Sequence, residues 1–148
     1  MTKEDKELLI QDLCARLPYN VMLYIRYYDL QGSGGLDERN VELTYGNIGY
    51  CIDRSHWVDV KPYLRSMSSM TEEEFTKLKK YSGLIYDQLD LASFQNGTYK
   101  CLDFYLNEVP SYVVILVFDW LNRNHFDYRG LIERGLAIEV TEENNPYE

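Results

Sequence analysis

The stretch Ser111–Val140, SYVVILVFDWLNRNHFDYRGLIERGLAIEV, decides the fold because it has the densest apolar content of the chain. Its first residue can cap a helix, since a serine hydroxyl accepts a bond from a free backbone N–H. The apolar residues that follow recur on one broad helical face: Val113, Val114, Val117, Phe118 and Leu121. The β-branched run Tyr112–Phe118 also fits a buried strand, so helix and strand both remain open for it.

The second half of this stretch predicts a tight corner, a short helix and a final strand. Asp127 is placed to cap a helix over Tyr128–Arg134. Gly135 stands where a left-handed residue usually ends a helix, because glycine takes a positive φ without a Cβ penalty. Leu136–Val140 then alternates as a strand, which we expect to pair into the sheet.

The corner residues His125, Asp127 and Arg129 are the one cluster that invites a catalytic interpretation. A histidine beside a carboxylate can act as a general base, and an arginine can hold an anion. The same residues also fit a structural corner, in which Asp127 caps a helix and Arg129 braces it. We expect the structural corner and assign no catalytic residue, with a small enzyme centred on His125 as an alternative.

Three segments, in order, resemble a family of small uncharacterised proteins of Bacteroides-type gut bacteria and their phages or mobile elements. They are LIQDLCARLPYNV (Leu9–Val21), VKPYLRSMSSMTEEE (Val60–Glu74) and DWLNRNHFDYRGLIERGLAIE (Asp119–Glu139), about a third of the chain together. Asn20 departs from the glycine that the family carries after Leu-Pro-Tyr. The resemblance implies a bacterial or phage origin, and it brings no assigned activity.

Composition predicts an α+β protein in one domain over residues 1–148. The length of 148 residues fits a single domain, and 45% hydrophobic residues suffice for a packed core. Apolar runs are far shorter than the ~18 residues that span a bilayer. The charged start MTKEDKELL lacks an apolar export signal. We therefore expect a soluble cytoplasmic protein without a membrane partner.

The net charge of −9 argues against direct nucleic-acid binding, because phosphate contact requires clustered lysine and arginine. Lys77, Lys79 and Lys80 are the one close group, and three glutamates precede them, so a solvated helix face explains them better. The acidic charge leaves open an inhibitor that imitates nucleic acid, provided its carboxylates line one surface.

The first part of the chain predicts a helix followed by a small antiparallel sheet. Thr2 and Asp5 form a capping box for a helix over Thr2–Arg16. Four segments predict the strands: Val21–Tyr28, Val41–Tyr45, Ile48–Ile52 and His56–Val60. Gly46-Asn47 is the expected hairpin turn, Gln31–Asn40 a flexible loop, and Lys61-Pro62 the end of the last strand. The sheet is either open or barrel-like.

A second capping box, Thr71 with Glu74, predicts the start of another helix, which Gly83 kinks or ends. The structure of Ala92–Val109 is undecided. The expected order is therefore an N-terminal helix, the sheet, further helices and a C-terminal strand. One shared core is expected to hold five residues: Leu13, Ile25, Trp120, Leu131 and Ile138.

The residues that could hold a metal or cofactor do not form a complete site. Cys14, Cys51 and Cys101 are widely spaced, which predicts free thiols. Cys51 with His56 would supply only half of the four ligands that zinc needs. The glycine-rich loop lacks the Gly-Lys-Ser/Thr ending of a phosphate-binding loop. We expect neither metal nor cofactor.

Tyrosines on the first strand give the clearest sign of binding. Period-two alternation places Tyr24, Arg26 and Tyr28 on one face of Val21–Tyr28. Tyrosine and arginine are enriched at binding hot spots, although tyrosine also covers half-buried sheets. We therefore expect a non-enzymatic protein-binding or adaptor module, whose partner is another protein or a second copy, with these three residues at the contact.

Overall fold

The computed structural model describes residues 1–32, 34–53, 57–84, 90–97 and 109–148, which form an α+β protein. The chain divides into two compact units. Unit 1 comprises Met1–Leu64 and Arg129–Glu148, and unit 2 comprises Arg65–Tyr128. Each unit has its own cluster of buried apolar side chains.

Unit 1 begins with helix α1 (Lys3–Arg16), and the predicted capping box is confirmed. The Thr2 hydroxyl accepts from the Asp5 N–H at 3.0 Å, and the Asp5 carboxylate accepts from the Thr2 N–H at 3.2 Å. A short 3-10 turn, η1 (Leu17–Tyr19), follows the helix. Asn20 then adopts φ 56°, so the left-handed geometry suited to glycine is present with asparagine in its place.

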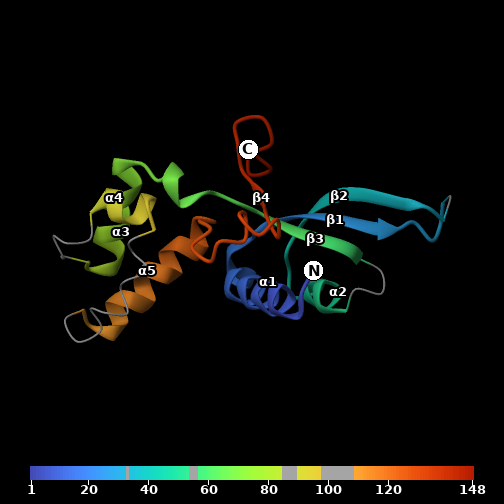
Figure 1. The fold of residues 1–148 in the computed structure, drawn as a ribbon, viewed down its shortest axis with the longest axis horizontal. Helices are drawn as coiled ribbons and strands as arrows, with labels where there is room; N and C mark the ends of the chain where they lie inside the picture. Colours follow the sequence, from blue (N-terminus) through green and yellow to red (C-terminus); the bar gives the residue numbers. More distant parts are fainter. Residues whose placement is uncertain (33, 54–56, 85–89, 98–108) are drawn as a thin grey trace. The chain divides into compact units, whose positions relative to one another are not determined.

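The sheet of unit 1 has four strands in the order β2-β1-β3-β4 (Figure 1). They are β1 (Met22–Tyr28), β2 (Leu36–Glu42), β3 (Trp57–Leu64) and β4 (Ile138–Glu139). The first three pair antiparallel, whereas β4 pairs parallel to β3 through Tyr63 and Leu64. The sheet is therefore mixed and open: the expected antiparallel pairing is confirmed for β1, β2 and β3, the C-terminal strand β4 joins in parallel, and the barrel-like form is ruled out.

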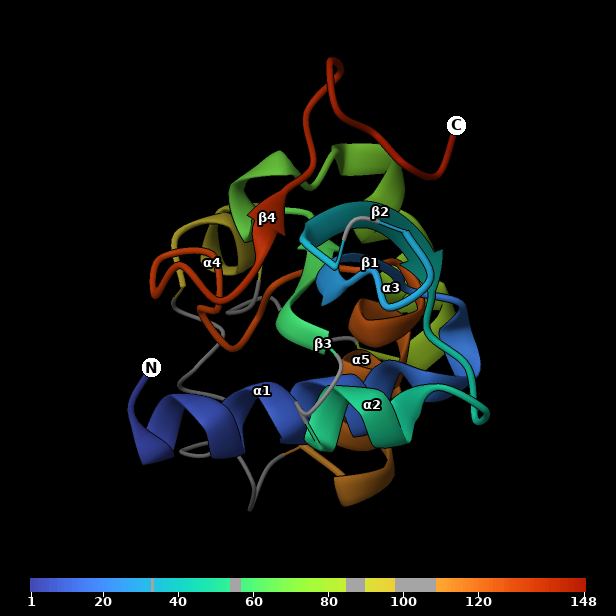
Figure 2. The same cartoon turned by 90° about the vertical axis from the view of Figure 1, so that its right-hand side faces the viewer.

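One face of this sheet carries the core of unit 1. Leu23 and Ile25 of β1 are fully buried and pack with Leu9 and Leu13 of α1. Helices α1 and α2 lie beneath this face in both views (Figures 1 and 2). The register shifts between Arg26 and Tyr27, which leaves an extra residue in β3 and places Trp57 opposite Tyr27. That bulge turns the Trp57 side chain into the core.

Three strand predictions are wrong in this unit. The expected loop Gln31–Asn40 contains most of β2, whose polar side chains gave no alternating pattern. Ile48–Ile52 is the helix α2, because the Asn47 side chain accepts from the Thr44 N–H and the Ile48 N–H bonds the Thr44 carbonyl. Strand β3 continues through Lys61-Pro62, since a proline at a position facing away from β1 costs no ladder bond.

The predicted helix over Tyr128–Arg134 is also wrong, because these residues form bends and one turn. Gly130 has φ 77°, which no helix accommodates. Gly135 does take the expected left-handed φ, 70°, and closes a Schellman-type turn. In that turn the Leu136 N–H bonds the Leu131 carbonyl at 2.9 Å, and the chain then enters β4. Asp127 therefore caps no helix.

A buried carboxylate links α1 to this returning segment. Asp12 accepts from the Arg16 Nε at 2.7 Å and from the Arg129 Nη1 at 2.9 Å. The side chains of Asp12 and Arg16 are 0% exposed. Near the C-terminal end, the Tyr147 hydroxyl donates to the Tyr63 carbonyl at 2.8 Å and accepts from the Met22 N–H at 3.1 Å. Burial raises the pKa of Tyr147 to about 12, so it remains a donor at neutral pH.

Unit 2 is helical. Its elements are η2 (Met67–Ser69), α3 (Glu72–Ser82), α4 (Leu91–Gln95) and α5 (Ser111–Arg123). The predicted capping box of Thr71 and Glu74 is confirmed, and Gly83 ends α3 with φ 74°. The open choice for Tyr112–Phe118 is resolved as helix, with Pro110 rather than Ser111 at the N-cap. Residues 98–108 of the undecided segment lie outside the described residues.

The core of unit 2 forms where one face of α5 packs against the other helices of the unit. Val113, Val117 and Leu121 are buried on that face, and Trp120 stacks on Phe126 with ring centroids 5.8 Å apart. The expectation of one shared core is therefore wrong. Trp120 belongs to the cluster of unit 2, whereas three of the other four residues belong to that of unit 1: Leu13, Ile25 and Leu131.

Replacing Trp120 by alanine should lower the free energy of unfolding of unit 2 by about 3–5 kcal/mol, because it empties a buried aromatic site. Chemical denaturation followed by far-UV circular dichroism measures this loss. Tyr112→Ala on the exposed side of α5 is the matched control and should change stability by less than about 0.5 kcal/mol. Equal stability of both variants would contradict the core assignment.

Candidate functional site

The three residues expected at the contact lie on the sheet face opposite the core of unit 1. Arg26 and Tyr28 are exposed and Tyr24 is half-buried, while the alternate residues Leu23 and Ile25 are buried. The period-two assignment of faces is therefore confirmed. That these residues contact a partner remains a prediction.

Neighbouring strands frame these side chains with polar groups. Arg26 lies between Glu38 of β2 and Asp59 of β3 in the strand register. The Tyr24 hydroxyl donates a hydrogen bond to the Glu38 carboxylate, which holds the ring across β2. This bond, followed by burial, raises the pKa of Tyr24 above its ordinary value, because ionisation would place two negative charges together.

The end of the β1–β2 hairpin adds an apolar group that the sequence pattern missed. Tyr28 and Leu36 are cross-strand partners and are 48% and 49% exposed. Leu30, in the connecting loop, is 74% exposed. Asp29 organises that loop by accepting from the N–H groups of Gln31 and Gly32 at 3.2 and 3.0 Å. We call Tyr24, Arg26, Tyr28, Leu30 and Leu36 the hairpin surface.

Charges around the hairpin surface alternate in sign. Lys61 lies opposite Tyr24, and Arg26 stands between two acidic residues. On β2, Arg39 packs over the Tyr27 ring, with its Cζ 5.0 Å from the centroid, beside the acidic Asp37 and Glu38. A uniform row of carboxylates, as nucleic-acid mimicry requires, is therefore not the pattern of this part of the sheet.

The expected corner residues have backbone roles. His125 follows Asn124, the C-cap of α5, with φ 62°, and its carbonyl accepts from the Arg65 N–H at 2.8 Å. Asp127 is buried, and its N–H donates to the Arg65 carbonyl at 2.8 Å. The backbone of this corner therefore bonds both the N–H and the carbonyl of Arg65, a residue that the sequence pattern did not single out. Arg129 belongs to unit 1, where it bonds Asp12.

Arg65 is fixed further by its side chain. Its Nη1 pairs with the Glu74 Oε1 at 2.5 Å, and its guanidinium lies 4.3 Å from the Phe126 ring centroid. Burial raises the pKa of Glu74, but the bonds from Arg65 and Thr71 outweigh burial and lower it overall. An ion pair, a ring contact and two backbone bonds together give this corner a structural explanation.

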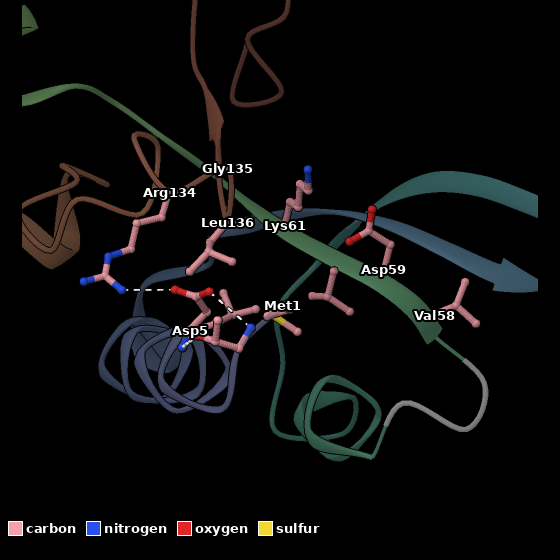
Figure 3. Close-up of a pocket in the computed structure, with 11 residues that line it drawn as sticks. Met1, Asp5, Val58, Asp59, Lys61, Arg134, Gly135 and Leu136 are labelled. Carbon is pink, nitrogen blue, oxygen red and sulfur yellow. Dashed lines mark hydrogen bonds and ion pairs between the residues drawn. The ribbon is translucent and has the colours of Figure 1, made fainter.

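A cavity of about 650 Å³ opens in unit 1, between the start of α1, the edge of β3 and the turn before β4 (Figure 3). Its lining residues are Met1, Thr2, Asp5, Leu9, Val58, Asp59, Val60, Lys61, Arg134, Gly135 and Leu136. Arg134 donates to the Asp5 carboxylate at 3.0 Å across it. Hydrogen bonds from Thr2 and Arg134 lower the pKa of Asp5. His125 does not line this cavity.

Within the described residues no three His, Cys, Asp or Glu side chains gather as a metal site. Cys14 is an exposed and Cys51 a buried free thiol, whereas His56 and Cys101 lie outside the described residues. No helix in the described ranges has the length and apolar content to cross a membrane.

Replacing Glu38 by glutamine should lower the pKa of Tyr24 toward its ordinary value of about 10, because the carboxylate that disfavours the phenolate is gone. A pH titration followed by NMR of the tyrosine ring resonances measures the pKa of Tyr24. Asp37→Asn, which alters the neighbouring carboxylate on β2, should leave the pKa of Tyr24 nearly unchanged. An unchanged pKa in Glu38→Gln would mean that Tyr24 is not held across β2.

Comparisons with protein-family models, with curated proteins and with solved structures give no match to the chain. The family resemblance of the three segments therefore remains a prediction. The role of the hairpin surface has to be inferred from its own geometry and chemistry.

Proposed function

We propose that this protein is a protein-binding or adaptor module and that the hairpin surface is its contact. The observation that carries the proposal is the exposed apolar group of Tyr28, Leu30 and Leu36 beside the exposed Arg26. Water contact with apolar side chains is unfavourable, so covering this group by a partner would contribute to affinity.

The composition of the hairpin surface supports a protein partner. Tyrosine and arginine combine a large contact area with a polar end, and both are frequent among hot spots. The three residues on β1 stand on a paired strand, so their backbone loses little freedom on binding. The bond of Tyr24 to Glu38 fixes one ring in advance.

The two alternatives have less support. An acidic inhibitor that imitates nucleic acid would need carboxylates along one surface, and Arg26 and Lys61 interrupt them here. A small enzyme centred on His125 would need that side chain in a cavity, and the described cavity has other walls. We therefore favour a non-enzymatic role.

The family resemblance and the cysteines bear on origin and location. The resemblance of the three segments supports a bacterial or phage source. Free thiols at Cys14 and Cys51 fit the reducing cytoplasm. We place the protein there and take the partner to be another cytoplasmic protein, with a second copy of the chain as the competing possibility.

The variant Arg26→Ala/Tyr28→Ala should lose the partner while remaining folded, because both side chains are exposed. Quantitative affinity capture from source cells, with wild type and variant compared by mass spectrometry, measures the loss. The captured amount of at least one protein should fall about tenfold or more with the variant, as expected when hot-spot residues are truncated. Size-exclusion chromatography of the purified chain separates self-association from binding to another protein.

The matched control is Lys80→Ala/Tyr112→Ala, which removes one cation and one exposed tyrosine from unit 2. It should retain every protein that wild type captures. If the hairpin variant also retains them all, the hairpin surface is not the contact. If both variants lose the same proteins, the capture depends on general charge or apolar content.

A further inference from the structure

The ladder between β1 and β2 determines which backbone groups of β2 face outward. At one end of the hairpin the Asp29 N–H bonds the Gly35 carbonyl at 2.9 Å, and at the other end the Leu43 N–H bonds the Val21 carbonyl at 2.9 Å. Both pairs follow the strand register, so every second residue counted from Gly35 bonds β1. The residues between those positions point their N–H and C=O groups away from β1.

The outward set comprises Leu36, Glu38, Asn40 and Glu42. All four residues are exposed, and none of them is a proline. Because β2 is the end strand of the sheet, no described strand pairs with this set (Figure 1). The Glu38 N–H donates to the Asp37 carboxylate, and the Glu42 carbonyl accepts from the Asn47 side chain. Among the described residues, the other outward groups form an open hydrogen-bonding edge.

Three tyrosine hydroxyls hold this edge in place without covering it. Each donates to a polar side chain of β2: Tyr24 to Glu38, Tyr27 to Asp37 at 3.1 Å, and Tyr63 to Asn40 at 3.0 Å. A carboxylate has about four acceptor positions, so the Asp37 and Glu38 carboxylates retain the capacity to bind a cation. An edge that is fixed in advance loses little freedom on binding.

The charges of β2 select against a second copy of the chain. When the middle of the strand pairs with its copy about a two-fold axis, each register brings like charges together: Glu38 opposite Glu38, Arg39 opposite Arg39, or Glu38 opposite Glu42. Like charges directly opposite each other destabilise a pair of strands. Charged side chains protect many exposed edges from self-association in this way. They leave the edge open to a strand of complementary charge.

The same charges favour a basic occupant. Strand β2 carries Asp37, Glu38 and Glu42 against Arg39, an excess of two acids. Arg26 stands on β1, about 10 Å from an added strand and therefore roughly twice as far from it as Glu38. A strand with basic residues opposite the three acids gains from cross-strand charge pairs along the edge.

We propose that the outer edge of β2 at Leu36–Glu42 takes an extended basic segment of the partner protein as an added strand. This inference rests on the proposed function and names the part of the partner that is bound. Leu36 lies on this edge and on the hairpin surface, so an apolar residue opposite Leu36 would also help to cover Tyr28 beside it. Main-chain hydrogen bonds supply affinity, and alternating side chains supply specificity.

The test uses the full chain labelled with ¹⁵N and the peptide Lys-Val-Thr-Glu-Lys-Arg-Ile with blocked ends. Paired antiparallel from Glu42 to Leu36, this peptide places a basic residue opposite each acid of β2. Its addition should shift the amide resonances of Leu36–Glu42 and slow exchange of the outward Asn40 N–H about tenfold or more. The charge-reversed peptide Glu-Val-Thr-Lys-Glu-Glu-Ile should bind at least about tenfold more weakly. Absence of shifts in β2, or equal binding of both peptides, overturns the proposal.

Backbone pairing is tested on the peptide, so the protein remains unchanged. In the antiparallel register the N–H groups of the third and fifth peptide residues face β2. Methylating these two nitrogens should weaken binding at least about tenfold, whereas methylating those of the second, fourth and sixth residues should preserve it. Equal binding of both methylated peptides would mean that side chains alone carry the interaction and would overturn strand addition.

The choice of a basic segment is tested with two charge-matched variants of exposed residues. Glu42 lies on the outward edge of β2, whereas Glu133 lies in the turn before β4, the strand at the other end of the sheet. Glu42→Lys should weaken the basic peptide by about threefold or more relative to Glu133→Lys, the range of an exposed ion pair. Equal affinities of the two variants would contradict the selection for basic residues.

The peptide experiment and the affinity capture fail independently. If the peptide does not bind while capture still depends on Arg26 and Tyr28, strand addition is wrong and the hairpin surface remains the contact. If the peptide pairs with β2 as expected while Arg26→Ala/Tyr28→Ala retains every captured protein, strand addition is supported and the role of the hairpin surface fails.

Discussion

The carboxylate of Asp12 is the constraint on which unit 1 depends. It stands between Arg16 on its own helix and Arg129 from 117 positions further along the chain, and the side chains of Asp12 and Arg16 are fully buried while that of Arg129 is partly exposed. Removing one partner of a buried ion pair typically costs about 3–5 kcal/mol, because the remaining charge is left without compensation. Asp12 thereby fixes the point at which the chain returns to α1. Strand β4 and the wall of the cavity follow from that point.

Local signals made part of the fold predictable. Both capping boxes involve residues three positions apart, so the sequence contains the whole interaction. Strand β2 could not be found this way, because it is exposed on both faces and pairs with β1 through its backbone. The segment after Asp127 shows the opposite case. It carries plausible signals for the start and end of a helix, but Gly130 adopts a positive φ between them.

The candidate surfaces also differ in how far local sequence patterns predict them. The Tyr24–Arg26–Tyr28 face follows from alternation along one strand, and its exposure agrees with that pattern. Leu36 joins it only through the register of the β1–β2 hairpin, and Leu30 only through the path of its loop. The cavity beside β3 requires three segments distant in sequence and a parallel ladder that stops after two residues. No local pattern encodes such an interruption.

A double-mutant cycle between Asp12 and Arg129 tests most directly whether this bridge holds the returning segment. Asp12→Asn, Arg129→Met and the double variant are compared with wild type by urea denaturation. The bridge predicts a coupling energy of more than about 1 kcal/mol, since residues that share a buried ion pair are not additive. The bridge would be contradicted if the stability loss of the double variant equalled the sum of the two single losses within about 0.3–0.5 kcal/mol. Only residues that act independently are additive in this way.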